Sequence, residues 1–189
     1  MKTLDATVKT FFLSVAAASL LLCSGGVRAE TKVTVGVGHM CCAGCQAAAK
    51  TALAEVASDV AIDGTNVTVT LKDNATDIVP VLDALRKGGF PATKIEAGSG
   101  PVTIGVAHLC CGGCSAALDK ALRSSKIEAL NLDSIKVADG ALTLKAKEGQ
   151  SLDLVPVLAS MEKAGFSPKS ITMGAATAAL RPKAKLAAH

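Results

Sequence analysis

The sequence predicts an α+β protein made of two tandem ferredoxin-like domains, each with the element order βαββαβ, an antiparallel four-stranded sheet and two helices on one face of it. One observation behind this prediction is an internal repeat, because a shift of 69 residues places His39 on His108 and aligns the three cysteines that follow each histidine. Another is the periodicity within each copy, which is that of a strand before the cysteines and of a helix after them. Copies of roughly 65 to 75 residues also suit one such domain each.

The first half of each copy predicts a strand, a helix and a hairpin. In the run Val33–Val37, apolar residues alternate with small or polar ones, as in a half-buried strand. After the cysteines, Ala49 and Leu53 fall on one face of a helix. A further strand is predicted at 66–71, and Asp63-Gly64 just before it is typical of a hairpin turn.

The second half of each copy predicts a capped helix and a last strand. Asp77 is the expected N-cap, and Pro80 follows in the first turn, where a missing N–H costs little. Gly89 is expected to end the helix in the left-handed conformation, before a strand around Ile95. A shift of 76 residues places these four positions on Asp153, Pro156, Gly165 and Ile171. The second copy therefore has seven extra residues, which we expect between its first helix and its hairpin.

The N-terminal segment, residues 1–29, is predicted to be a secretory signal peptide. A mildly basic start precedes the apolar run Phe11–Cys23, and Val27 and Ala29 have the spacing of a cleavage site. This segment places the mature protein in the periplasm or outside the cell, where disulfides form readily. A lipoprotein anchored through Cys23 is the alternative, although the residue before that cysteine, a leucine, fits such a site poorly.

The remaining chain divides into two domains and a tail. The first domain is predicted at 30–98 and the second at 101–174, joined by a short Gly-rich linker at 96–101. Residues 175–189 are rich in Ala and Lys, and we expect this tail to be disordered. The linker length leaves open whether the two cysteine loops share one cluster.

The composition makes several functions improbable. The 189 residues include no Trp, no Tyr and only four Phe, so the aromatic platforms that stack on nucleic-acid bases or sugars are missing. The formal net charge of +4 is weak and dispersed, which does not suggest a polyanionic partner. No membrane span is expected after signal removal. No acid–base pair or activated nucleophile stands out, so the sequence does not predict an enzyme.

The repeated cysteine loop is the chemically informative feature. It reads His39-Met40-Cys41-Cys42-Ala43-Gly44-Cys45 and recurs as His108-Leu109-Cys110-Cys111-Gly112-Gly113-Cys114. A helix N-terminus beside a cysteine stabilises the thiolate and lowers its pKa. Thiolates are soft ligands that select ions such as Cu(I) and Zn(II). Because Zn(II) usually takes four ligands, two cysteines alone would not satisfy it.

The loop in this setting resembles the motif Gly-Met-x-Cys-x-x-Cys of the heavy-metal-associated (HMA) domain family. That family includes copper chaperones, N-terminal modules of metal-pumping P-type ATPases and periplasmic mercury-binding proteins. The resemblance covers nearly all of residues 32–173, twice. It implies a soft-metal cargo and, as partner, a membrane metal transporter or another metal-binding protein. The metal-binding pairs that it implies are Cys42 with Cys45 and Cys111 with Cys114, and it places Gly89-Phe90 and Gly165-Phe166 beside them.

The loops also depart from the family motif. Histidine stands where the family has Gly, and Cys41 and Cys110 stand where it usually has Thr or Ser. Leu109 replaces Met40 in the second copy, and leucine cannot ligate a metal, so Met40 is interpreted as a packing residue. Cys41 and Cys110 therefore join the candidate ligands, as part of a three-thiolate or a thiolate-plus-imidazole site. The two histidines, His39 and His108, are either metal-associated groups or polar residues at a strand end.

Other interpretations of the cysteines stay open. Six cysteines after signal removal is an even number that disulfides could use, but three per loop cannot all pair within one loop. The sequence Cys42-Ala43-Gly44-Cys45 also resembles a redox dithiol, although the flanking Trp and Pro are absent and the element order is not that of thioredoxin. We therefore predict an exported protein that scavenges, buffers or transfers a soft metal ion. Cu(I) is the favoured ion, and Hg(II) and Zn(II) are the alternatives. A thiol-disulfide oxidoreductase and an interaction module without metal are the alternatives.

Overall fold

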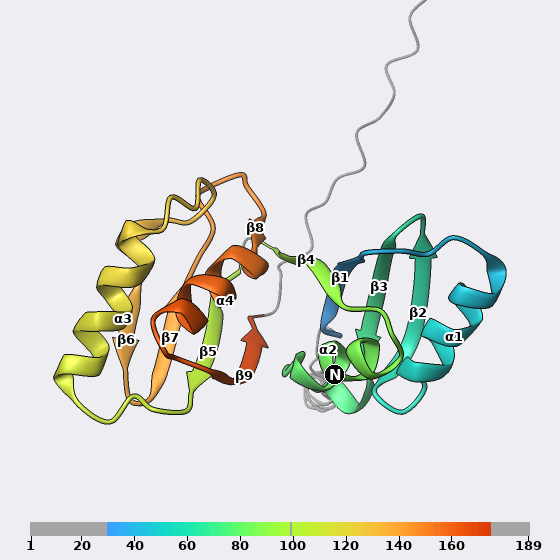
Figure 1. The fold of residues 1–189 in the computed structure, drawn as a ribbon, viewed down its shortest axis with the longest axis horizontal. Coiled ribbons are helices and arrows are strands. Elements are labelled where there is room, and N and C mark those ends of the chain that lie inside the picture. Colours follow the sequence, from blue (N-terminus) through green and yellow to red (C-terminus); the bar gives the residue numbers. More distant parts are fainter. Residues whose placement is uncertain (1–29, 99, 175–189) are drawn as a thin grey trace, which may run out of the picture.

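The structure is a computed structural model, and it describes residues 30–98 and 100–174. The predicted signal peptide, 1–29, and the predicted tail, 175–189, lie outside the described residues, as does the candidate lipid-anchor residue Cys23. The described chain forms two antiparallel sheets with helices packed against them (Figure 1).

The first sheet has the strand order expected of a ferredoxin-like domain. Its elements are β1 Lys32–Val37, α1 Ala43–Leu53, β2 Ala57–Asp63, β3 Asn66–Leu71, α2 Val79–Lys87 and β4 Ala92–Ala97. A short 3-10 turn, Lys72–Asn74, follows β3. The strands lie in the order β2-β3-β1-β4, so the two strands of the hairpin are beside β1 and the last strand is on its other side. Alternate residues of β1 point into the core, with Val33, Val35 and Val37 all buried.

The second domain repeats this arrangement. Its elements are β5 Val102–Val106, α3 Gly112–Ser124, β6 Lys136–Ala138, β7 Ala141–Leu144, β8 Leu152–Asp153, α4 Leu154–Lys163 and β9 Pro168–Met173. Its sheet has the order β6-β7-β5-β9, which matches the first domain strand for strand. The predicted fold of two tandem ferredoxin-like domains is confirmed. The extra residues of the second copy lie between α3 and β6, where a 3-10 turn, Leu132–Ser134, occupies part of the longer connection.

The helix-ending glycines adopt the predicted conformation. Gly89 has φ +87° and follows α2 after one further residue. Its N–H donates to the carbonyl of Arg86 at 3.1 Å, and the next N–H, that of Phe90, donates to the carbonyl of Leu85 at 2.8 Å. These two bonds form a Schellman motif, which buries Phe90 against the end of the helix. Gly165 and Phe166 make the equivalent bonds after α4.

The aspartates predicted as N-caps both accept a hydrogen bond from the first turn of their helix. Asp153 accepts from the backbone N–H of Val155 at 3.0 Å and is the N-cap of α4. Asp77 accepts from the N–H of Val79, also at 3.0 Å, but the helix begins one residue later, with Ile78 in the flanking position.

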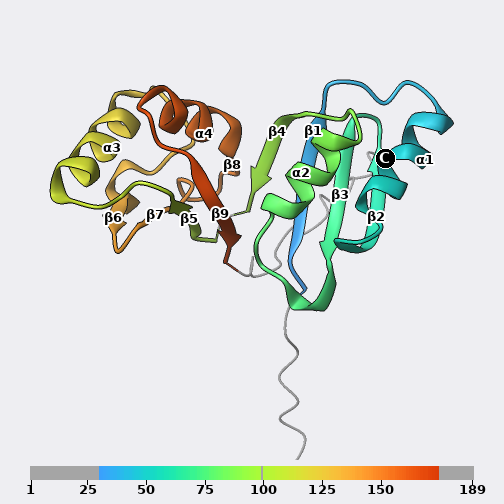
Figure 2. The same cartoon turned by 60° about the horizontal axis from the view of Figure 1, so that its bottom comes forward.

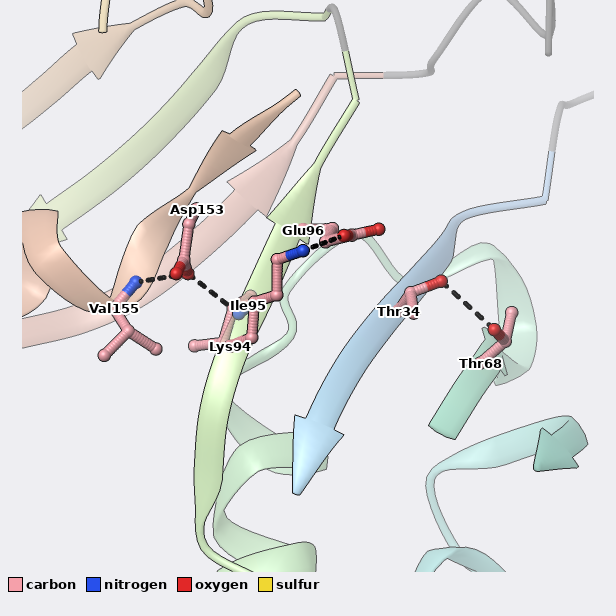
Figure 3. A network of polar contacts seen from close by, with 7 residues as sticks. All are labelled: Thr34, Thr68, Lys94, Ile95, Glu96, Asp153 and Val155. Carbon is pink, nitrogen blue, oxygen red and sulfur yellow. Dashed lines mark hydrogen bonds and ion pairs between the residues drawn. The ribbon is translucent and has the colours of Figure 1, made fainter. Parts of the chain in front are cut away.

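The linker is shorter than the sequence predicts, because its first two residues belong to β4. Glu96 pairs with Asp153, and Ala97 pairs with Leu152, so β8 of the second domain extends the sheet of the first (Figure 3). The strand β8 was not predicted, since two residues give no periodicity. In return, Asp77 of the first domain forms a β-bridge with Thr172 on β9. Each domain therefore covers the edge strand of the other with the residues that precede its second helix.

This reciprocal contact places the two cysteine loops far apart. The loop from β1 to α1 and the loop from β5 to α3 lie at opposite ends of the molecule in both views (Figures 1 and 2). The question that the linker left open is thereby answered, since the two loops of one chain do not form a shared cluster. Within the described ranges, no helix is both long enough and apolar enough to cross a bilayer.

Candidate metal centre

Each cysteine loop connects the first strand of its domain to the first helix. Cys42 has an extended backbone, with φ −155° and ψ 167°, and is the N-cap residue of α1. Cys111 has nearly the same angles, φ −155° and ψ 166°, and is the N-cap residue of α3. The N-cap position ordinarily carries an oxygen that accepts from the free N–H groups of the first turn. Here a sulfur takes that place in both domains.

The structure brings together all three cysteines of the first loop. The Sγ atoms of Cys42 and Cys45 are 3.5 Å apart, and those of Cys41 and Cys45 are 3.6 Å apart. The three sulfurs all lie within 4.8 Å of one another. Cys41 and Cys42 are exposed and Cys45 is half-buried, so the protein partly covers one residue of the cluster and leaves the other two accessible to solvent.

The second loop repeats the geometry. The Sγ atoms of Cys111 and Cys114 are 3.4 Å apart, and those of Cys110 and Cys114 are 3.9 Å apart. Its three sulfurs also lie within 4.8 Å of one another, with Cys114 as the half-buried member. The six cysteines of the two loops are all free thiols in the described part of the chain. Every candidate cysteine ligand that the sequence indicated is therefore in one of two matching clusters.

The start of each helix favours one thiolate in each cluster. The backbone N–H of Cys45, then the Cys45 thiol and the N–H of Gly44, lower the pKa of Cys42 below its ordinary value. The backbone N–H of Cys114, its thiol and the N–H of Gly113 likewise lower the pKa of Cys111. None of these N–H groups makes a well-aligned cap hydrogen bond, so the effect is that of several N–H dipoles facing one exposed sulfur.

A second thiol in each cluster holds its proton more firmly. The pKa of Cys41 is raised by the hydrogen bonds between its thiol and the thiols of Cys45 and Cys42. The pKa of Cys114 is raised by the corresponding bonds from Cys111 and Cys110. Each cluster therefore has one thiol with a lowered pKa and one with a raised pKa, and a bound cation would displace the proton from the latter.

The histidines do not join the sulfurs. Among the described residues, only the two cysteine triplets bring three or more potential ligand atoms of His, Cys, Asp or Glu within 4.8 Å of one another. The His39 ring instead faces the ring of Phe90, with centroids 5.5 Å apart and planes tilted by 34°. The His39 ring thus packs beside the buried Phe90 ring and not against the sulfurs. Met40 and Leu109 are half-buried and pack against the hydrophobic core, as predicted for a packing residue.

A glycine directly before the second cysteine of each pair also acts on the thiolate, a role that was not predicted from the sequence. Gly44 and Gly113 both turn a backbone N–H toward the thiolate, and a Cβ at these positions would lie 3.6 and 3.7 Å from the Sγ of Cys42 and Cys111. The signal available was that glycine is the one residue type shared by the two x-x dipeptides, Ala43-Gly44 and Gly112-Gly113.

The structure contains two ferredoxin-like domains in tandem, each with a Cys-Cys-x-x-Cys cluster at the start of its first helix. This is the arrangement that the sequence resemblance to HMA domains implies. No family model matches the sequence, and a search of curated proteins finds no match.

Solved structures with some likeness to this chain include two from Bacillus subtilis. The N-terminal soluble domains of CopA share 16% identity at a TM-score of 0.34, over 75% of this chain and 93% of that one. The water-soluble region of the P-type ATPase CopA shares 17% identity at a TM-score of 0.35, over 76% and 91%. At such values the fold assignment rests on the strand order of this chain itself.

Proposed function

We propose that this protein binds one soft metal ion at each of its two cysteine clusters, Cu(I) by preference and Hg(II) or Zn(II) behind it. The observation that carries the proposal is the convergence of three thiol sulfurs within 4.8 Å, twice, at the N-terminus of a helix. Three thiolate ligands of this kind bind soft cations in preference to hard ones. We propose further that the protein is exported to the periplasm or secreted, and that it is not an enzyme.

The arrangement supports metal binding better than a scaffold disulfide. A scaffold disulfide joins segments that the chain keeps apart, whereas all three sulfurs here belong to residues within five positions of one another. Four of the six thiols, those of Cys41, Cys42, Cys110 and Cys111, are exposed rather than packed into the core. A solvent-exposed cluster in which one thiol has a lowered pKa suits an ion that is bound and later released.

The exposed side of each cluster suits transfer of the ion by ligand exchange. An incoming thiolate from a partner would reach the ion beside Cys42 while the half-buried Cys45 still holds it. A new metal–sulfur bond then forms before an old one breaks, so the ion is never free. The partner would be a membrane metal transporter or another metal-binding protein, and the protein would serve to scavenge, buffer or transfer the ion.

Anaerobic titration tests this proposal. Fully reduced protein is titrated with Cu(I), Zn(II) and Hg(II) in the presence of a competing chelator, beside the double variant Cys42→Ser/Cys111→Ser. We expect two ions per wild-type chain and a large loss of affinity in the variant. Circular dichroism of both proteins checks that the fold is unchanged, as expected for substitutions at exposed positions. Equal binding by the two proteins would show the proposal to be wrong.

A thiol-disulfide oxidoreductase is the second candidate. The exposed Cys42, with its lowered pKa, lies 3.5 Å from Cys45, which is the relationship of an attacking and a resolving thiol. A thiol count on protein quenched with acid directly after extraction separates the two functions. Six free thiols per chain, counted after removal of the predicted signal peptide that carries Cys23, support metal binding. A Cys42–Cys45 disulfide that turns over with a dithiol substrate supports the redox function.

A further inference from the structure

We propose that Cys41 and Cys110 are ligands, so that each ion is held by three thiolates of this chain alone. This inference rests on the proposed function and adds the coordination number to it. Each thiol that binds the ion gives its proton to solvent, and the ion is neither oxidised nor reduced.

The sulfur separations favour three ligands over two. With a metal–sulfur bond of about 2.3 Å, two thiolates on opposite sides of an ion stand about 4.6 Å apart, and three in a plane stand about 4.0 Å apart. The separations of the Cys42–Cys45 and Cys41–Cys45 pairs, 3.5 and 3.6 Å, are much nearer to the second value. A two-coordinate ion would have to push Cys42 and Cys45 apart by about 1 Å, against the first turn of the helix.

The third sulfur is placed in the same way in both domains. Cys41 and Cys110 each approach the half-buried cysteine of the helix, four residues further along, rather than pointing away into solvent. The residues around the two clusters differ, with Met40 and Ala43 in one and Leu109 and Gly112 in the other. Because the neighbouring residues differ, a chance side-chain rotamer of Cys41 would not be expected to recur at Cys110.

Other ligands that could complete the site are absent from its surroundings. Among the described residues, no His, Asp or Glu side chain joins either sulfur triplet. The imidazole of His39, the nearest alternative along the chain, lies over Phe90. A thiolate-plus-imidazole site is therefore disfavoured, and the site suits soft ions that accept three thiolates, Cu(I) and Hg(II), over Zn(II), whose fourth position would be left to water.

The test compares the wild-type chain with the double variant Cys41→Ser/Cys110→Ser, each loaded anaerobically with two equivalents of Cu(I). X-ray absorption at the copper edge counts the sulfur neighbours of the ion. We expect three in the wild type and two in the variant. Competition with a chelator should show the affinity falling by at least about tenfold, since even residues that merely orient a ligand typically cost 10- to 100-fold when replaced. The variant Gln46→Ala, at an exposed position beside Cys45, is the matched control and should retain three sulfurs.

The outcomes separate this inference from the proposed function. Tight binding with two sulfurs in both proteins overturns the inference and leaves the proposed function standing. Failure of the wild-type chain to bind Cu(I) or Hg(II) overturns both. Loss of the third sulfur in Cys41→Ser/Cys110→Ser, with unchanged circular dichroism, establishes Cys41 and Cys110 as ligands.

Discussion

The carboxylate of Asp153 accepts a hydrogen bond from the backbone N–H of Ile95 at 3.0 Å, across the boundary between the two domains (Figure 3). The same oxygen also caps α4 by accepting from Val155. Its counterpart Asp77 accepts from the N–H of Ile171 at 2.9 Å while it accepts from the first turn of α2. Each aspartate thus stabilises a helix of its own domain and an edge strand of the other, which joins the two domains by a reciprocal pair of contacts.

Replacement of Asp153 by Ala should destabilise the protein by about 1–3 kcal/mol, because the helix loses its cap and the Ile95 N–H loses its partner. Urea denaturation measures the loss. Hydrogen exchange at Ile95 should quicken in the same variant. The variant Asp153→Asn keeps an acceptor oxygen and should lose less stability than Asp153→Ala. If Asp153→Ala leaves the exchange of Ile95 unchanged, the contact between the domains does not exist in solution.

Iodoacetamide should alkylate Cys42 and Cys111 first in the reduced, metal-free protein. Their pKa values are lowered from the ordinary 9.0, whereas that of Cys41 is raised, and the thiolate is the reactive form. A lowered pKa means that the thiolate is present at pH values where an ordinary thiol is still protonated. The advantage should therefore be greatest below pH 9.0 and should fade above it. Peptide mass spectrometry over a pH series measures the order.

The control for this order is Cys45→Ala. It removes the thiol that shares a hydrogen bond with Cys42 but keeps the backbone N–H of residue 45, so the pKa of Cys42 should rise only in part and its alkylation should slow without stopping. Faster labelling of Cys41 than of Cys42 at neutral pH would contradict the geometry of the cluster.

The two sites should bind metal independently. Because the loops lie at opposite ends of the folded molecule, Cys42→Ser should abolish one of two binding events and leave the affinity of the other unchanged within about threefold. The variant Cys111→Ser should give the converse result. Isothermal titration under anaerobic conditions reports both stoichiometry and affinity. A change of more than tenfold in the remaining site would indicate coupling that the structure does not contain.

Replacing His39 by Ala should change Cu(I) affinity far less than replacing Cys41 by Ser. The imidazole of His39 lies 5.5 Å from the Phe90 ring, centroid to centroid, and does not belong to the sulfur cluster. We expect an effect below about threefold, against at least about tenfold for Cys41→Ser. Chelator competition on both variants measures the difference, and a larger loss in His39→Ala would make the imidazole a ligand after all.

Phe90→Ala should cost about 3–5 kcal/mol of folding stability, because a buried aromatic side chain leaves a cavity. The buried Phe90 closes the Schellman motif at the end of α2, and Phe166 does so after α4. Phe90→Leu retains an apolar group and should cost less, although it removes the ring beneath His39. Urea denaturation measures both variants, with Phe166→Ala as the matched substitution in the second domain. Equal losses for Phe90→Ala and Phe90→Leu would show that the ring itself carries the packing.

The sequence alone determined the features that depend on local periodicity and on residue type. Alternating valines produced β1 and β3, Asp63-Gly64 produced the hairpin, and Gly89 produced the helix end, because each of these preferences acts within a few residues. The repeat also identified every cysteine of the candidate site, since both copies carry the same spacing.

The relative placement of these parts depends on contacts between residues that are far apart in the sequence. The contact between Asp153 and Ile95 joins residues 58 positions apart, and no local pattern encodes such a pairing. The two-residue strand β8 forms because it pairs with β4, the edge strand of the other domain. With the domains joined in this way, the two cysteine loops lie at opposite ends of the molecule. Likewise, the sequence placed both His39 and Cys41 beside the paired cysteines, with Cys41 as a candidate ligand and the role of His39 open. In the folded protein the imidazole of His39 packs against Phe90, which follows α2. The thiol of Cys41 instead contacts the thiol of Cys45.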